Sequence, residues 1–99
     1  NDGEQRRDFT YVGDVVNANI LAATHPEDLK GESFNIGNGD NYSVNELADM
    51  FGGEKQYGVE VLEPFQTLAD NSKAKNILNW NPTGDLPAWI EKYKKELGI

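Results

Sequence analysis

Two adjacent arginines, Arg6 and Arg7, are the side chains of this sequence best suited to holding an anionic ligand. The planar fork of a guanidinium group can donate to two phosphate oxygens at once. The pair lies in the segment EQRRDFTYVGD, residues 4–14, whose aromatic, Thr and Val residues favour a short strand. Because successive side chains of a strand face opposite ways, only one of the two arginines can face a site. The alternative is that both form surface ion pairs.

The loop Gly37-Asn38-Gly39 is a second candidate, because it separates an expected strand from an expected helix. Backbone amides at such a point can cradle a phosphate. The dinucleotide fingerprint would require Gly or Ala at position 42, where this chain has Tyr42, and Asp40 would repel a phosphate. The pattern therefore favours a structural turn, with contact to a ligand held by a partner domain as the alternative.

The remaining polar residues have simpler explanations. His25 is the only histidine, and its place near a helix end favours contact with the helix carbonyl groups over catalysis. The chain has no cysteine, so it offers no thiolate ligand for a metal. Four aspartates stand at the expected ends of strands or helices, where capping explains them: Asp8, Asp14, Asp40 and Asp70. A pair of acids for glycoside hydrolysis stays open as an alternative. We assign no catalytic residue and no metal ligand.

Length and charge limit the function further. Ninety-nine residues make one domain, residues 1–99, with a modest core. The net charge of −8 disfavours binding to nucleic acid and to anionic membranes. No apolar run has the length of a membrane span, and no signal-peptide pattern is present. A cytoplasmic protein is the expectation.

The elements that must position these residues alternate between strands and helices. Strands are expected at residues 7–12, 33–36 and 59–65. Helices are expected after Asp14 as N-cap, after the capping box of Ser43 and Glu46, at residues 71–78, and from Asp85 onward. The last helix should bury a stripe formed by Trp89, Ile90, Tyr93 and Leu97. This order predicts a small α/β domain of α+β-like character, in which helices flank a short mixed sheet.

The first residues suggest a longer protein. Asn1-Asp2-Gly3, followed by a strand-like segment, is typical of a hairpin turn, and here it would lack its first strand. The chain also begins without methionine. We expect it to be a fragment.

Three segments, in order, resemble the NAD-dependent sugar-nucleotide epimerase/dehydratase family, the extended short-chain dehydrogenases/reductases. Residues 1–23 resemble its pattern GDGxQxRDFxxVxD. Residues 31–51 resemble xFNIGxGxxxSVxEL, and residues 67–93 resemble xxDxSKAKxxLGWxPxxxLxxGI. Together the segments cover nearly the whole chain.

The resemblance implies the C-terminal, substrate-binding part of such a protein, without its Rossmann nucleotide-binding half. The family's glycine-rich cofactor turn and its Tyr-x-x-x-Lys pair are absent from these 99 residues. The implied cofactor, NAD or NADP, would then belong to the full-length parent, and this chain would bind none. We expect no turnover by the chain alone, so whether it is called an enzyme depends on its parent.

Residue by residue, Arg7 matches the family arginine that binds the diphosphate of the nucleotide-sugar, and Gln5 matches a frequent nearby glutamine. Arg6 occupies a variable position. Many members carry a second diphosphate arginine where this chain has Phe65, in a segment that is shorter here. Asn79 replaces a usual glycine, and asparagine is the common substitute in a left-handed C-cap.

The resemblance thus predicts the substrate-binding portion of an NAD(P)-dependent epimerase or dehydratase, an isomerase in the first case. Its expected partners are a nucleotide-diphosphate sugar and the missing N-terminal Rossmann part. Apolar surface left open by that part would favour self-association into a homo-oligomer. The alternative is a stand-alone, truncated binding or interaction module without catalysis.

Overall fold

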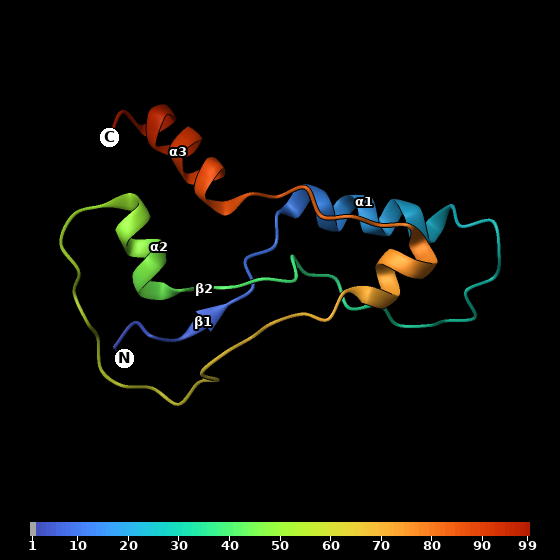
Figure 1. Ribbon diagram of the computed structural model, residues 1–99, viewed down its shortest axis with the longest axis horizontal. Coiled ribbons are helices and arrows are strands. Elements are labelled where there is room, and N and C mark those ends of the chain that lie inside the picture. The colour runs from blue at the N-terminus through green and yellow to red at the C-terminus, as the bar shows by residue number, and fades with distance from the viewer. Residues whose placement is uncertain (1) are drawn as a thin grey trace.

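The structure is a computed structural model that describes residues 2–99. Figure 1 shows an elongated, flat molecule whose two ends are built from different helices. In chain order the elements are β1 (Arg6–Arg7), α1 (Val12–Ala23), β2 (Tyr42–Ser43), α2 (Val44–Phe51), the π-helix η1 (Ala74–Leu78) and α3 (Leu86–Leu97). The predicted hairpin turn begins at Asn1, which lies outside the described residues.

The sheet is short and mixed, as predicted. β1 pairs antiparallel with β2, Arg6 standing opposite Ser43 and Arg7 opposite Tyr42. On its other side, Arg6 forms a parallel bridge with Gln66. The bridge consists of hydrogen bonds from Arg6 N to Phe65 O (2.8 Å) and from Thr67 N to Arg6 O (3.0 Å). β1 is therefore the central strand, and its position is fixed from both edges.

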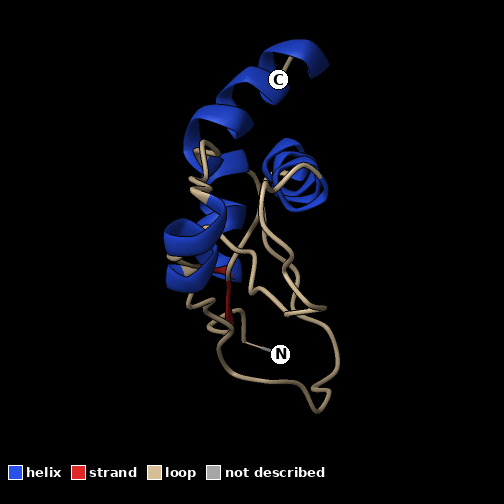
Figure 2. Cartoon of the chain, turned by 90° about the vertical axis from the view of Figure 1, so that its right-hand side faces the viewer, coloured by secondary structure: helices blue, strands red, loops and turns tan. Residues whose placement is uncertain are grey.

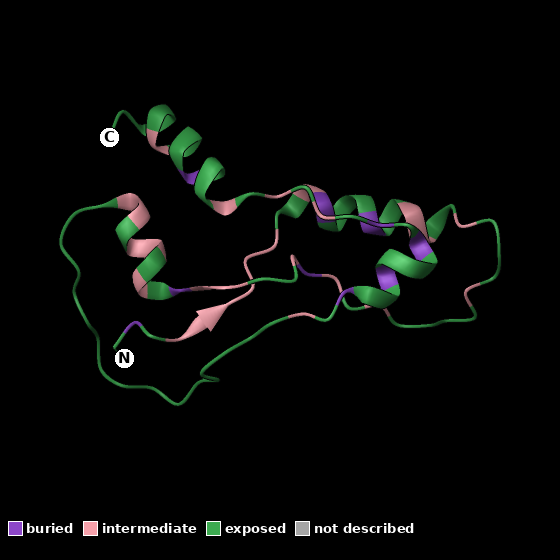
Figure 3. Ribbon diagram, in the orientation of Figure 1, coloured by how far each residue is buried: buried purple, intermediate pink, exposed green. Residues whose placement is uncertain are grey.

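One small core lies between α1 and η1. Its buried members are Ala18, Ala74, Leu78 and Trp80, and Figure 3 shows buried positions on both α1 and η1. Asn79 ends η1 with φ of 56°, in the left-handed conformation expected for an asparagine C-cap. That turn brings Trp80 back between the two helices, where its side chain is fully buried.

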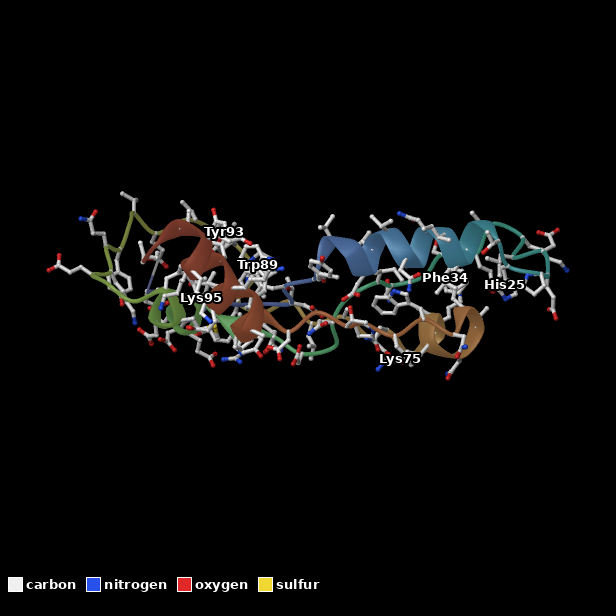
Figure 4. The ribbon with its side chains drawn as sticks, turned by 90° about the horizontal axis from the view of Figure 1, so that it is seen from above. His25, Phe34, Lys75, Trp89, Tyr93 and Lys95 are labelled. Atoms are coloured by element: carbon white, nitrogen blue, oxygen red, sulfur yellow. The ribbon has the colours of Figure 1, made fainter. Side chains whose placement is uncertain are left out.

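A second contact joins α2 and α3. The capping box of α2 is confirmed: Ser43 Oγ accepts from Glu46 N at 3.0 Å, and Glu46 Oε1 accepts from Ser43 N at 2.9 Å. The last helix begins near Asp85, as expected, and Asp85 caps it by accepting from Ala88 N. Tyr93 lies edge-on to Phe51 of α2. Figure 4 shows Trp89 and Tyr93 close together on α3, where their rings stack 4.9 Å apart.

Much of the apolar surface remains uncovered. The radius of gyration is 16.5 Å, against about 13 Å for a compact domain of 100 residues. The accessible surface is 7035 Å², whereas a compact protein of this mass exposes about 5600 Å². Figure 2 shows the molecule from one end, and its shortest extent is 16 Å.

Several element predictions are wrong. Residues 33–36 form no strand, since no described segment pairs with their backbone. The strand expected at residues 59–65 does not form, and the structure has only a single bridge next to it, at Gln66. The strand expected at residues 7–12 is shorter, because β1 contains only Arg6 and Arg7. Of the stripe expected on α3, only Ile90 is buried. Helix α1 begins at Val12, so Asp14 lies inside its first turn and is not its N-cap.

Candidate functional site

The guanidinium group of Arg6 is hydrogen-bonded to the fold through all three of its nitrogens. Its guanidinium donates from Nε to Asn41 Oδ1 (2.9 Å), from Nη1 to Glu46 Oε1 (2.8 Å) and from Nη2 to the Asn41 carbonyl (3.0 Å). The same Glu46 carboxylate caps α2, so Arg6 ties β1 to the start of that helix. Each of the three nitrogens donates one hydrogen bond, so three of the five N–H groups of Arg6 are used to hold the fold together.

The guanidinium of Arg7 donates hydrogen bonds to the fold from Nη1. Its Nη1 donates to the Arg6 carbonyl at 2.7 Å and lies 3.5 Å from the Phe65 carbonyl. Its Nη2 faces the Glu63 carboxylate at 3.7 Å, which is an ion-pair distance but too long for a hydrogen bond. The side chain is 26% exposed. One edge of the guanidinium is thus fixed by carbonyl groups, while the other remains able to donate to an anion.

Gln5 precedes Arg7 by two residues in the chain. It lines a shallow hollow of about 520 Å³ together with Asp2, Tyr57, Gly58 and Glu60. Asp2 and Glu60 make this hollow acidic, which disfavours a phosphate group. The role of Gln5 and Arg7 in substrate binding stays a prediction.

The glycine loop is organised by an internal carboxylate. Asp8 accepts hydrogen bonds from Asn38 N (2.9 Å) and Gly39 N (3.0 Å), and also from Ala69 N (3.2 Å). At Gly37 a Cβ atom would collide with Ala69 Cβ, and Gly39 has a φ of +88°. The amides that could have cradled a phosphate already bind Asp8. This supports the interpretation of the loop as a structural turn, fixed beside Arg7.

We expect Asp8→Asn to lower the free energy of unfolding by about 1–3 kcal/mol, because an amide replaces a charged acceptor shared by three backbone donors. Hydrogen exchange should quicken at the amides of Asn38 and Gly39. Asp40→Asn is the matched control, since it removes the same charge from an exposed residue of the same loop, and it should change stability by less than about 0.5 kcal/mol. Equal effects of the two variants would contradict the role given to Asp8.

Another hollow is an open groove of about 580 Å³ between residues 9–12 and the start of α3. Its lining is mainly apolar and includes Phe9, Tyr11, Leu86 and Trp89, with Lys92 at its edge. Tyr11 and Trp89 are 46% and 45% exposed. Such an apolar surface is suited to contact with another protein segment more than to a phosphate.

Asp14 holds the two walls of this groove together. Its carboxylate, 3% exposed, accepts from Thr83 Oγ1 (2.7 Å), Thr83 N (2.9 Å) and Gly84 N (2.8 Å). Burial alone would raise the pKa of Asp14, but these hydrogen bonds outweigh it and hold the pKa below its ordinary value. Asp14 is therefore the anion that fixes the segment leading into α3.

The other polar candidates have structural roles. His25 lies at the end of α1 (Figure 4), with its ring nitrogens 3.0 Å from the Glu27 carbonyl and 3.1 Å from the Ile77 carbonyl. Asp70 accepts from Ser72 N and Ser72 Oγ, and these bonds hold its pKa below the ordinary value. Among residues 2–99 no group of three or more His, Asp or Glu side chains is placed to hold a metal ion. No helix in this part of the chain is long and apolar enough to cross a membrane.

Sequence reasoning missed three features: the binding of the glycine loop by Asp8, the contact of Asp14 with residues 83–84, and the approach of Glu63 to Arg7. Each joins residues that lie between 30 and 70 positions apart. The one available signal was the presence of aspartates beside predicted turns, which was interpreted only as local capping.

Comparison with known proteins finds similarity to the NAD dependent epimerase/dehydratase family. Residues 1–37 match the model of the NAD dependent epimerase/dehydratase family. A putative UDP-glucose 4-epimerase of Methanocaldococcus jannaschii is 39% identical over 98 residues, which are 92% of this chain and 30% of that protein. A UDP-glucuronate 4-epimerase of Thermodesulfobacterium geofontis is 36% identical over 91 residues, covering 82% of this chain and 27% of that protein.

Solved structures agree with these sequence matches. The UDP-glucuronic acid 4-epimerase of Bacillus cereus, in complex with UDP-glucuronic acid and NAD, superposes on 97% of this chain with a TM-score of 0.78 and 33% identity. MoeE5, in complex with the same two ligands, covers 99% of the chain with a TM-score of 0.82 and 31% identity. The chain spans 34% and 36% of these two structures, and about 30% of the curated relatives.

Proposed function

We propose, from the premise that this chain belongs to the NAD-dependent epimerase/dehydratase family, that it is a substrate-holding portion that binds the diphosphate of a nucleotide-sugar through Arg7. The observation that supports the proposal is that the guanidinium groups of Arg6 and Arg7 differ in their hydrogen bonds to the fold. Arg6 donates from all three of its nitrogens to the fold, whereas Arg7 has one edge fixed and one edge open to an anion. Solvent exposure alone would not identify Arg7 as the ligand-binding arginine, because the side chain of Arg6 is the more exposed of the two.

A uridine diphosphate sugar is the ligand class we propose. The two relatives described above are UDP-glucose and UDP-glucuronate 4-epimerases, and the Bacillus cereus and MoeE5 structures contain UDP-glucuronic acid. The diphosphate would lie against the Nη2 edge of Arg7. Gln5 is left out of phosphate contact, because the hollow that it lines carries Asp2 and Glu60.

The residues of this chain do not fit the family's dinucleotide cofactor. The one glycine loop that precedes a helix has its amides bound by Asp8, and an added pyrophosphate would have to displace that carboxylate. We therefore propose that NAD binding and the chemical step belong to the part of the family fold that these 99 residues do not span. The apolar groove beside Trp89 and the exposed valines of α1 are surfaces suited to pack against that part.

The role of Arg7 in this chain is tested by titrating UDP into the 99-residue protein and following its amide and guanidinium signals by NMR. Charge-assisted hydrogen bonds contribute about 1.5–3 kcal/mol. Arg7→Ala should therefore weaken UDP binding by about ten- to a hundredfold, and Arg7→Lys should restore it only in part, because an ammonium lacks the planar fork.

Lys75→Ala is the control, since it removes the same charge from an exposed residue of η1 that Figure 4 shows far from α3. It should leave UDP binding unchanged. Loss of binding to the same extent in Arg7→Ala and Lys75→Ala would mean that only the net charge of the chain matters, and would refute a site at Arg7.

A further inference from the structure

Phe65 presents an exposed aromatic side chain next to Arg7. The residue is 64% exposed, yet its carbonyl accepts a hydrogen bond from Arg6 N at 2.8 Å and lies 3.5 Å from Arg7 Nη1. The backbone that carries the ring is therefore in contact with the guanidinium proposed to hold the diphosphate. Among the residues that the structure describes, no second ring and no cation lies on the Phe65 ring, so no π contact within the fold uses its faces.

The register of the sheet places Phe65 and Arg7 on the same face. Gln66 is the bridge partner of Arg6. Because successive side chains of an extended segment point to opposite sides, the neighbours of this pair, Arg7 and Phe65, both point to the other side. They are one strand and two residues apart, which separates their Cα atoms by about 8 Å. The approach of Glu63 to Arg7, at 3.7 Å, agrees with this placement, since Glu63 and Phe65 are two residues apart.

The segment that leads to Phe65 is held in place at several points. Lys55 Nζ pairs with Asp49 at 2.7 Å, and Tyr57 Oη donates to Asn45 Oδ1 at 3.2 Å, so both side chains are bound to residues of α2. At its end, the carbonyl of Phe65 is hydrogen-bonded to the central strand β1. An aromatic side chain on a fixed backbone loses little conformational entropy when a ligand packs on it.

The charges around Arg7 favour a ligand that also offers a neutral contact. The chain has a net charge of −8, and the carboxylate of Glu63 lies at ion-pair distance from Arg7 Nη2. This negative charge opposes the attraction of Arg7 for a diphosphate. A uracil base is uncharged, and every nucleobase has a π face that can stack on an aromatic ring. In a nucleotide the ribose separates the base from the phosphates by a distance comparable to that between Phe65 and Arg7.

We propose that Phe65 is the nucleobase-stacking residue of the site, on which the base of the nucleotide lies while the diphosphate contacts Arg7. The proposal rests on the function proposed above and names a second contact of the same site. It makes Phe65 the residue that favours nucleoside diphosphates over diphosphates without a base. Because stacking tolerates every base, Phe65 does not distinguish uridine from other nucleosides. It contacts the ligand and takes no part in a chemical step.

The experiment compares UDP with inorganic pyrophosphate, each titrated into the 99-residue protein and followed by NMR. Phe65→Ala should weaken UDP binding by about five- to tenfold, the lower range for the loss of a stacked base, and should leave pyrophosphate binding unchanged. Arg7→Ala should weaken the binding of both. Phe65→Tyr keeps the ring and should retain UDP binding. Leu62→Ala is the control, since it removes an apolar side chain from a fully exposed position of the same segment, and it should affect neither probe.

A stacked base also gives a direct signal. In the complex of the parent with UDP, nuclear Overhauser effects should join the Phe65 ring protons to H5 and H6 of uracil. If Arg7→Ala weakens UDP binding but Phe65→Ala does not, the stacking role is refuted and the proposed function stands. Equal loss of UDP and pyrophosphate binding in Phe65→Ala would refute the stacking role too, because the substitution would then act through Arg7. If the parent binds neither probe, both proposals are refuted.

Discussion

Trp80→Ala is expected to lower the free energy of unfolding by about 3–5 kcal/mol, the usual cost of truncating a large buried aromatic side chain. Trp80 is 0% exposed and fills the space between α1 and η1, against Ala18, Ala74 and Leu78. Its Nε1 also donates to the Asp14 carbonyl at 2.9 Å. Because the core holds so few buried side chains, no neighbouring cluster can compensate for the cavity.

Chemical denaturation followed by far-ultraviolet circular dichroism measures this effect. Trp89→Ala makes the same chemical change at a residue that is 45% exposed and stacked on Tyr93, so it should cost only about 1 kcal/mol. Trp80→Phe keeps most of the ring and loses the indole donor, and should cost about 1–2 kcal/mol. Equal destabilisation by Trp80→Ala and Trp89→Ala would contradict the position of the core.

Asp14→Ala is expected to destabilise the fold by about 3 kcal/mol, because it leaves the donors of Thr83 and Gly84 without their charged acceptor. Asp14→Asn keeps the shape and one acceptor oxygen, and should cost less than Asp14→Ala. The loss should also loosen the start of α3, which would appear as faster hydrogen exchange at Gly84. A cost below about 1 kcal/mol would mean that water replaces the carboxylate without penalty.

The same residue makes a prediction about pH. The pKa of Asp14 is lower in the folded chain than its ordinary value, so the folded state favours the ionised form. Its contribution to stability is therefore complete above the unfolded pKa of about 3.9, and it is lost as the pH falls through the lower folded-state pKa. The stability difference between the parent and Asp14→Asn should accordingly shrink in acid. A difference that stays constant from neutral pH to pH 2 would contradict this assignment.

Local signals were predictable from the sequence because their partners lie within one helical turn. Ser43 and Glu46 form the expected capping box, Asp85 caps α3, and Asn79 adopts the left-handed conformation. In each case the donor and acceptor are separated by at most a few residues, so residue type and spacing determine the bond.

Long-range partners were not predictable from the same reasoning. Asp14 has the residue type and the position of an N-cap, but a stronger set of donors, 70 positions further along, holds it inside the helix. The apolar alternation of residues 33–36 is real, yet a strand requires a neighbour, and none of the described residues supplies one. Trp89 and Tyr93 follow the helical period and still face solvent, because periodicity shows which residues share a face and not what covers it.

For the candidate site, the sequence predicts that Arg6 and Arg7 differ, and the ligand-binding role of Arg7 stays a prediction. Strand alternation separates the roles of Arg6 and Arg7, and the structure gives them different partners on the two edges of β1. What the sequence could not supply was the reason, namely that every nitrogen of the Arg6 guanidinium donates to Glu46 or Asn41. The approach of Glu63 to Arg7 depends on how a long loop returns to the sheet, which no local pattern encodes.

The central claim is that Arg7 holds the diphosphate of the ligand, and a crystal structure of the 99-residue protein with UDP tests it most directly. The account predicts that Arg7 Nη2 donates to phosphate oxygens at about 2.8 Å, while Nη1 stays on the Arg6 carbonyl. It is contradicted if the diphosphate lies elsewhere while Arg7 keeps its contact with Glu63.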